Sequence, residues 1–177
     1  MTGEGTAGGL LSVDIPPGIQ LHGVDQVAGA QFLLALGAVV RASSHLEFVL
    51  RSVFCELEDG PNAAVVATGQ GADWLLGMNA ALAKHRTNIP NDDRDQLGAL
   101  LSRARSATQD RNRFVHDVWG GSPDGPLLGR SQRRIASMTN RPLALAEVVV
   151  TAHALHSCST DLVDWATHVL SSRHPGQ

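Results

Sequence analysis

The feature that most constrains the fold of this chain is a helical spacing of apolar residues, which recurs in four long segments. The clearest segment begins at Asp25, where apolar residues follow one another mostly at intervals of three or four and define one face of a long helix. These residues are Phe32, Leu36, Val39, Leu46, Leu50, Val53 and Leu57. The stretch EDGP at 58–61 then supplies a glycine stop followed by a proline, which predicts the end of this helix.

Three more helices are expected further along the chain. The second covers 73–85 and turns four apolar residues inward: Trp74, Leu75, Met78 and Leu82. The third covers 93–119, with Asn91 as its N-cap and Asp92 and Asp93 suited to the positive start of the helix. The fourth covers 143–170.

Strand candidates are nearly absent, so we expect an all-α fold, an up-and-down four-helix bundle. A Gly/Pro-rich insertion, GGSPDGPLLG at 120–129, precedes the last helix, and RSQRRIASM at 130–138 is read as a short strand or an arm. The 177 residues fit one domain with a real core. We expect a flexible arm at 1–22, the helical domain at 23–171 and a polar tail at 172–177.

The sequence is typical of a soluble, cytoplasmic protein. The N-terminus has no basic segment followed by an apolar core, and no apolar run is expected to reach the length that crosses a bilayer. Two cysteines, Cys55 and Cys158, lie in apolar helical stretches, where reduced, buried thiols are expected. We therefore expect no contact with a membrane.

The net charge of −3 conceals a basic segment. Residues 103–141 hold eight arginines and three aspartates, a net charge of +5, whereas the rest of the chain has six basic and fourteen acidic residues, a net of −8. A basic segment in an acidic protein is a candidate surface for a polyanion. The alternative is that these arginines form ion pairs with the acidic remainder.

Several catalytic and metal-binding motifs are excluded. The chain has neither the Gly-x-Ser-x-Gly motif nor the HExxH motif, and GQGAD at 69–73 lacks the lysine and the preceding strand of a phosphate loop. His153 and His156 are three residues apart, but Cys158 falls on another side of the helix and no acidic ligand has a matching spacing. We therefore expect two surface or half-buried histidines, with no metal and no cofactor.

The sharpest chemical signal is RNRFVHDVW at 111–119, at the end of the third expected helix. It combines Arg111, Asn112 and His116 within the basic segment. The structural alternative is a helix C-terminus, where the helix dipole favours cations and the apolar residues between them simply pack.

RNRFVHD resembles the Arg–polar–x–x–x–His motif of the HEPN superfamily, whose domains are four-helix bundles with this motif near the end of the third main helix. The resemblance in helix order and motif placement covers about 25–170. It implies a metal-independent endoribonuclease of the kind found in toxin–antitoxin, abortive-infection and CRISPR systems, or a HEPN-like bundle that has lost catalysis and binds RNA or a protein. An enzyme of this kind implies a homodimer that acts on RNA as a toxin or phage-defence effector and is restrained by an antitoxin or regulatory protein.

The residue types suit RNA cleavage without a metal. Histidine can take a proton from the ribose 2′-OH as it attacks the adjacent phosphate, and arginine can hold that phosphate and stabilise the developing charge. Asn112 and His116 are four residues apart and share a helix face, so the amide is able to orient either partner. Arg111 and His116 are about 140° apart on a straight helix, which favours a site composed of two facing copies.

Other residues are expected to support this site. Glu47 is a candidate partner of Arg111, although an i,i+4 ion pair with Arg51 explains it equally well, and Asp117 is a further supporting candidate. Four arginines of the basic segment are candidates for contact with RNA: Arg113, Arg130, Arg133 and Arg134.

Overall fold

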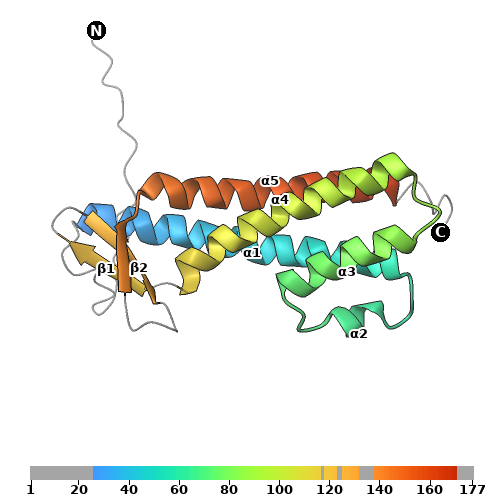
Figure 1. Ribbon diagram of the computed structural model, residues 1–177, viewed down its shortest axis with the longest axis horizontal. Coiled ribbons are helices and arrows are strands. Elements are labelled where there is room, and N and C mark those ends of the chain that lie inside the picture. Colours follow the sequence, from blue (N-terminus) through green and yellow to red (C-terminus); the bar gives the residue numbers. More distant parts are fainter. Residues whose placement is uncertain (1–25, 117, 123–124, 132–137, 171–177) are drawn as a thin grey trace, which may run out of the picture.

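The computed structural model describes the chain at residues 26–116, 118–122, 125–131 and 138–170, with side chains placed over 29–115 and 142–170. Within these ranges the chain is mostly helical (Figure 1). The long helices are α1 (Gln26–Glu58), α3 (Ala72–His85), α4 (Asn91–His116) and α5 (Leu145–Val169). They match the four expected segments, so the helical architecture is confirmed. The expected arm at 1–22 and tail at 172–177 lie outside the described residues.

The core forms where the apolar face of α1 meets the other long helices. Six of the seven residues expected on that face are buried, and Leu36 is half-buried. The Phe54 ring of α1 packs against Trp74 of α3 with ring centroids 5.3 Å apart. The buried Asn79 side chain donates from Nδ2 to the Leu50 carbonyl oxygen at 2.9 Å, which satisfies one polar group between α1 and α3.

The directions of the helices differ from the up-and-down expectation. Figure 1 shows α1, α3 and α5 running in one direction and α4 running in the opposite one. The reason is the length of the connection from α1 to α3. It spans 59–71 and contains the short helix α2 (Ala63–Ala67), so the chain has room to turn back before α3 starts. Gly69 adopts a positive φ of 75° in this connection, a conformation that suits glycine.

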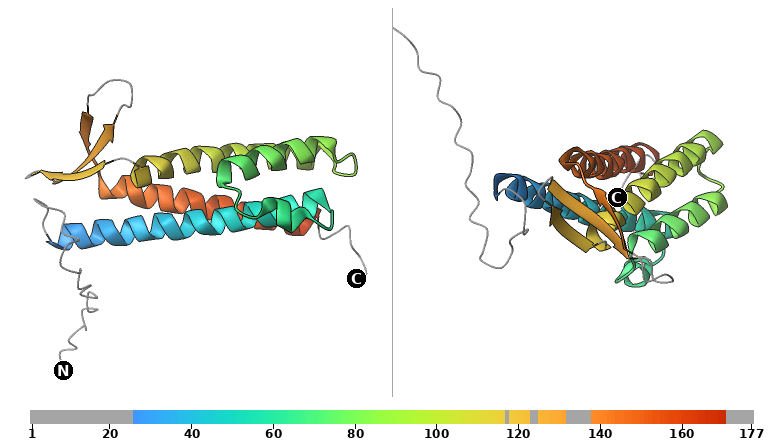
Figure 2. Two further views of the ribbon diagram at one scale, coloured as in Figure 1. Left: turned by 90° about the horizontal axis from the view of Figure 1, so that it is seen from below. Right: turned by 60° about the vertical axis from the view of Figure 1, so that its left-hand side comes forward.

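Antiparallel strands lie between α4 and α5, where a Gly/Pro-rich insertion and a short strand or an arm were expected. They are β1 (Val118–Ser122), β2 (Gly125–Ser131) and β3 (Met138–Pro142), in the order β1-β2-β3. The register pairs Trp119 with Leu128 and Gly129 with Asn140. The sheet lies at the end of the bundle where α1 begins and α4 ends (Figures 1 and 2).

Both ends of α4 also differ in detail from expectation. The helix ends at His116 rather than at Trp119, because the chain enters the β1 ladder at Val118. At its start, the Pro90 carbonyl accepts the first helical hydrogen bond, from the Arg94 N–H, so Pro90 rather than Asn91 occupies the cap position. The Asn91 side chain accepts a hydrogen bond from the Arg94 guanidinium.

Helix α1 is more apolar than expected. Its segment Gly29–Glu58 has 30 residues and contains an 18-residue window with a mean hydropathy of 1.5, so it is long and apolar enough to cross a membrane by length and composition only. The expectation that no apolar run reaches this length was therefore wrong. A core helix of a bundle has the same composition, and α1 packs against α3, α4 and α5.

Candidate functional site

The last two turns of α4 carry the Arg–Asn–x–x–x–His motif at the sheet end of the bundle. Arg111 and Asn112 are both half-buried, and His116 is the last residue of the helix. Because α4 is helical throughout 91–116, the backbone positions of Arg111 and His116 keep their angular separation of about 140°. The side chain of His116 and the whole of Asp117 lie outside the described part of the chain.

Arg111 occupies a position that the helical pattern assigns to the core. The buried residues of α4 recur at intervals of three or four along one stripe: Leu97, Leu100, Leu101, Ala104, Ala107, Thr108 and Phe114. Arg111 lies three or four residues from Ala107, Thr108 and Phe114, so it continues this stripe. Arginine is rarely placed at such a position without a partner for its charge.

The guanidinium of Arg111 is incompletely satisfied. Its Nη1 donates to Oδ1 of Asn112 at 3.0 Å, while its Nε is buried and has no acceptor among the described residues. No carboxylate in the described ranges forms an ion pair with it. The guanidinium is therefore held by Asn112, and no carboxylate of the described residues balances its charge. A phosphate group, which accepts several charge-assisted hydrogen bonds, would satisfy it.

Phe114 fixes the orientation of this helix end. Its side chain is 3% exposed, whereas the next residue, Val115, is 38% exposed. Burial of the ring sets the rotation of the last turns of α4, and this rotation places Arg111 on the half-buried side. Within the motif, Phe114 therefore serves packing, while Arg111 and Asn112 are left for another role.

Glu47 does not support Arg111 directly. Among the described residues no ion pair joins Glu47 to Arg111, and none joins it to Arg51, which was the alternative. Arg51 instead donates from Nε to the Ala67 carbonyl at 3.2 Å and from Nη2 to the Gln70 carbonyl at 3.5 Å. Its role is to hold the end of α2 and the following turn against α1.

The basic segment is partly neutralised by ion pairs. Arg103 lies 2.9 Å from Asp161 of α5, which agrees with the alternative that some of these arginines pair with the acidic remainder. Arg113, a candidate RNA contact, lies 3.0 Å from Asp110 in an exposed pair on its own helix. Of the other candidates, Arg130 belongs to β2, and Arg133 and Arg134 lie outside the described residues.

The described histidines and the cysteine of α5 lie on different faces of the helix. His153 and His156 are exposed on α5 and Cys158 is buried, so the expectation of two surface histidines is confirmed. Within the described ranges no cluster of three or more suitable side chains is able to hold a metal ion. Both cysteines are free, and burial raises the pKa of each thiol.

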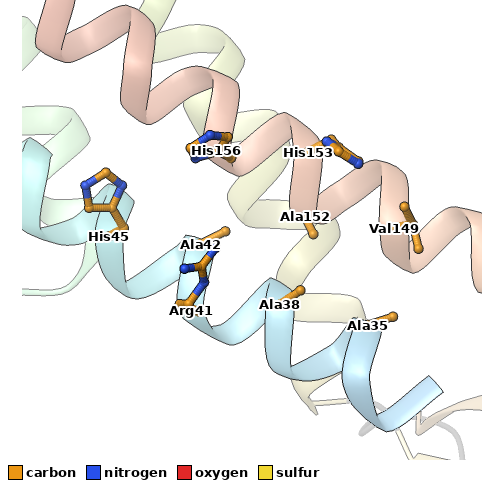
Figure 3. A pocket seen from close by; sticks show the side chains of 9 residues that line it. All are labelled: Ala35, Ala38, Arg41, Ala42, His45, Val149, Ala152, His153 and His156. Atoms are coloured by element: carbon orange, nitrogen blue, oxygen red, sulfur yellow. The ribbon is translucent and has the colours of Figure 1, made fainter. Parts of the chain in front are cut away.

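A second group of basic side chains was missed by the sequence analysis. Arg41 and His45 of α1 meet His153 and His156 of α5 around a pocket, which Figure 3 shows from close by. No signal in the sequence indicates this grouping, because it depends on α1 and α5 packing side by side over residues that are more than 100 positions apart.

Comparisons with known proteins add no further assignment: no protein-family model, no curated protein and no solved structure matches this chain.

Proposed function

We propose that this protein is a metal-independent endoribonuclease whose site includes Arg111, Asn112 and His116. The observation that carries the proposal is the incompletely hydrogen-bonded guanidinium of Arg111. This residue lies on the buried stripe of α4, and its buried Nε lacks an acceptor in the described part of the chain. A buried donor without a partner is costly, so its retention requires a reason. Binding of an RNA phosphate supplies one.

The proposed reaction is an attack by the ribose 2′-OH on the adjacent phosphorus. His116 removes the 2′-OH proton, the new P–O2′ bond forms and the P–O5′ bond breaks as the 5′ oxygen takes up a proton. The products are a 2′,3′-cyclic phosphate and a free 5′-OH. Arg111 holds the phosphate oxygens and stabilises the charge that develops on them, and Asn112 positions the guanidinium through the 3.0 Å hydrogen bond.

The angle between Arg111 and His116 favours a site shared by two subunits. Residues about 140° apart on one helix do not converge on one phosphate, whereas a homodimer can bring Arg111 of one subunit toward His116 of the other. The resemblance of RNRFVHD to the HEPN motif supports the same arrangement, and with it a role as a toxin or phage-defence effector that a partner protein restrains. The helix directions depart from an up-and-down bundle, so the proposal rests on the motif and not on the fold.

The proposed RNA surface extends from the end of α4 into the sheet. The basic segment continues there with Arg130 in β2 and Arg141 in β3. Replacing Arg133 and Arg134 by alanine should weaken RNA binding and flatten its dependence on salt, because fewer phosphate contacts release fewer counterions. An unchanged salt slope would assign these two arginines to folding or to a protein partner.

The decisive experiment is incubation of the purified protein with total RNA in EDTA. The wild type should cut RNA, and His116→Ala and Arg111→Ala should not, while each variant keeps the thermal midpoint of the wild type within about 2–4 °C. Arg105→Ala is the matched control, because Arg105 is an exposed arginine on the same helix outside the motif, and it should cut like the wild type. RNA that is bound but left intact by the wild type would indicate a catalytically silent binding module instead.

Mixing of variants tests the shared site. If each site takes Arg111 from one subunit and His116 from the other, a mixture of Arg111→Ala and His116→Ala subunits should regain up to about a quarter of the wild-type activity, since half of the dimers are mixed and each has one intact site. No recovery in a mixture that has demonstrably exchanged subunits would place both residues in the same subunit's site.

A further inference from the structure

A pocket of about 440 Å³ lies between α1 and α5, on residues that the proposed ribonuclease site does not use. Its size falls within the range of about 300–1,000 Å³ that is usual for small-molecule sites. Helices α1 and α5 run in the same direction here, with Ala35 near Val149 at one end and His45 near His156 at the other (Figure 3). Residues of α3 and α4 do not line the pocket.

The wall of the pocket is apolar because small side chains face one another along the two helices. It consists of Ala35, Ala38, Ala42, Val149 and Ala152. Alanines at these positions keep the helices close while leaving a hollow that larger side chains would fill. An apolar wall of this kind suits the planar or apolar body of a ligand.

The polar groups at the pocket are all bases. Arg41 and His45 come from α1, and His153 and His156 come from α5, whereas no carboxylate lines the pocket. None of these four side chains forms a hydrogen bond or an ion pair within the described part of the chain. Four exposed bases around one hollow, without an acid among them, are complementary to an anion.

We propose that this pocket binds a small phosphate monoester with a planar or apolar body, of the mononucleotide class. Arg41 supplies a permanent charge and a forked donor for the phosphate, and the histidines supply further hydrogen-bond donors. A monoester carries a charge of about −1.5 to −2 at pH 7, whereas a diester carries −1, so four bases favour the monoester. The alanine-lined wall contacts the body of the ligand.

The experiment uses isothermal titration calorimetry of the full chain with AMP, adenosine and the dinucleotide ApA, whose phosphate is a diester. AMP should bind at least tenfold more tightly than adenosine or ApA, because only AMP carries a phosphate monoester. Equal binding of AMP and adenosine would overturn the assignment of a phosphate site. Tighter binding of ApA than of AMP would overturn the preference for a monoester and would point to RNA backbone instead.

Two variants locate the binding at this pocket. Arg41→Gln should weaken AMP binding about tenfold or more, the expected loss of one charge-assisted contact, whereas Arg105→Gln, an exposed arginine on α4, should leave it unchanged. Ala38→Met should block the hollow without removing a charge, and Ala81→Met on exposed α3 surface is its control. Wild-type AMP affinity in both Arg41→Gln and Ala38→Met would overturn the proposal, whether or not the protein cuts RNA.

Discussion

The substitution Arg111→Met distinguishes a binding role of Arg111 from a structural role, because the two roles predict opposite effects on the free energy of unfolding. Methionine keeps the half-buried stem of Arg111 and removes the buried Nε, which has no acceptor in the described part of the chain. An unsatisfied buried donor costs about 1–3 kcal/mol, and the lost hydrogen bond to Asn112 was worth about 0.5–1.5 kcal/mol. The variant should therefore gain about 1 kcal/mol of unfolding free energy, and at 2–4 °C per kcal/mol its Tm should rise by about 2–4 °C.

Arg86→Met is the matched control for this experiment. Arg86 is also half-buried, but its Nε donates to the Leu57 carbonyl at 2.6 Å, so it is a satisfied structural arginine. Its 3.9 Å ion pair with the exposed Asp59 adds little. Arg86→Met should lower the free energy of unfolding by about 1–3 kcal/mol, because the Leu57 carbonyl loses its partner.

The assay is urea unfolding followed by far-ultraviolet circular dichroism, at one protomer concentration for all three proteins. Equal m-values are required before the midpoints are compared. If Arg111→Met loses as much stability as Arg86→Met, then Arg111 has a structural partner and the argument from its unsatisfied guanidinium is refuted.

Three further predictions concern packing and the thiols. In urea titrations, Phe114→Ala should lower the free energy of unfolding by about 3–5 kcal/mol, because the ring is buried. Val115→Ala, at an exposed position, should lower it by less than about 1 kcal/mol. Equal effects would contradict the orientation of α4. Cys55 should react with iodoacetamide at pH 8 before Cys158, because Cys55 is half-buried and Cys158 is buried, while burial raises the pKa of both thiols. Peptide mass spectrometry follows the reaction, and the reverse order would contradict the burial of Cys158. Gly69→Ala should lower the free energy of unfolding by about 1–2 kcal/mol, because Gly69 has a φ of 75° that alanine adopts only with strain. An unchanged thermal midpoint would refute this prediction.

The four long helices were predictable because each one carries its own pattern. The apolar spacing of α1, for example, extends over about seven turns, from Phe32 to Leu57, and EDGP marks the end of the helix. Helix α2 was missed, since five residues, AAVVA, are too few to show a period. A strand was named in advance only at 130–138, as an alternative to an arm; 130–131 lie in β2, 138 lies in β3, and 132–137 lie outside the described residues. The rest of the sheet was missed, because VWGGS and MTNRP contain glycine or proline and do not alternate clearly, and their stability comes from pairing along the sheet.

The directions of the helices and the basic pocket depend on tertiary contacts that no local pattern encodes. In the sequence, Arg41 and His45 do not differ from other surface residues of α1. They form a group with His153 and His156 only because α5 packs beside α1. The position of Arg111 was predictable in part. Arg111 lies three residues from both Thr108 and Phe114, so the sequence could have placed it among the buried positions of α4. Only the structure shows which hydrogen bonds its guanidinium makes.

The most direct test of the proposed ribonuclease is the chemistry of the RNA ends that the protein produces in EDTA. The account predicts 2′,3′-cyclic phosphate and 5′-OH ends from the wild type, and no such ends from a folded His116→Ala variant. Products with 5′-phosphate ends, or identical cleavage by His116→Ala, would contradict it.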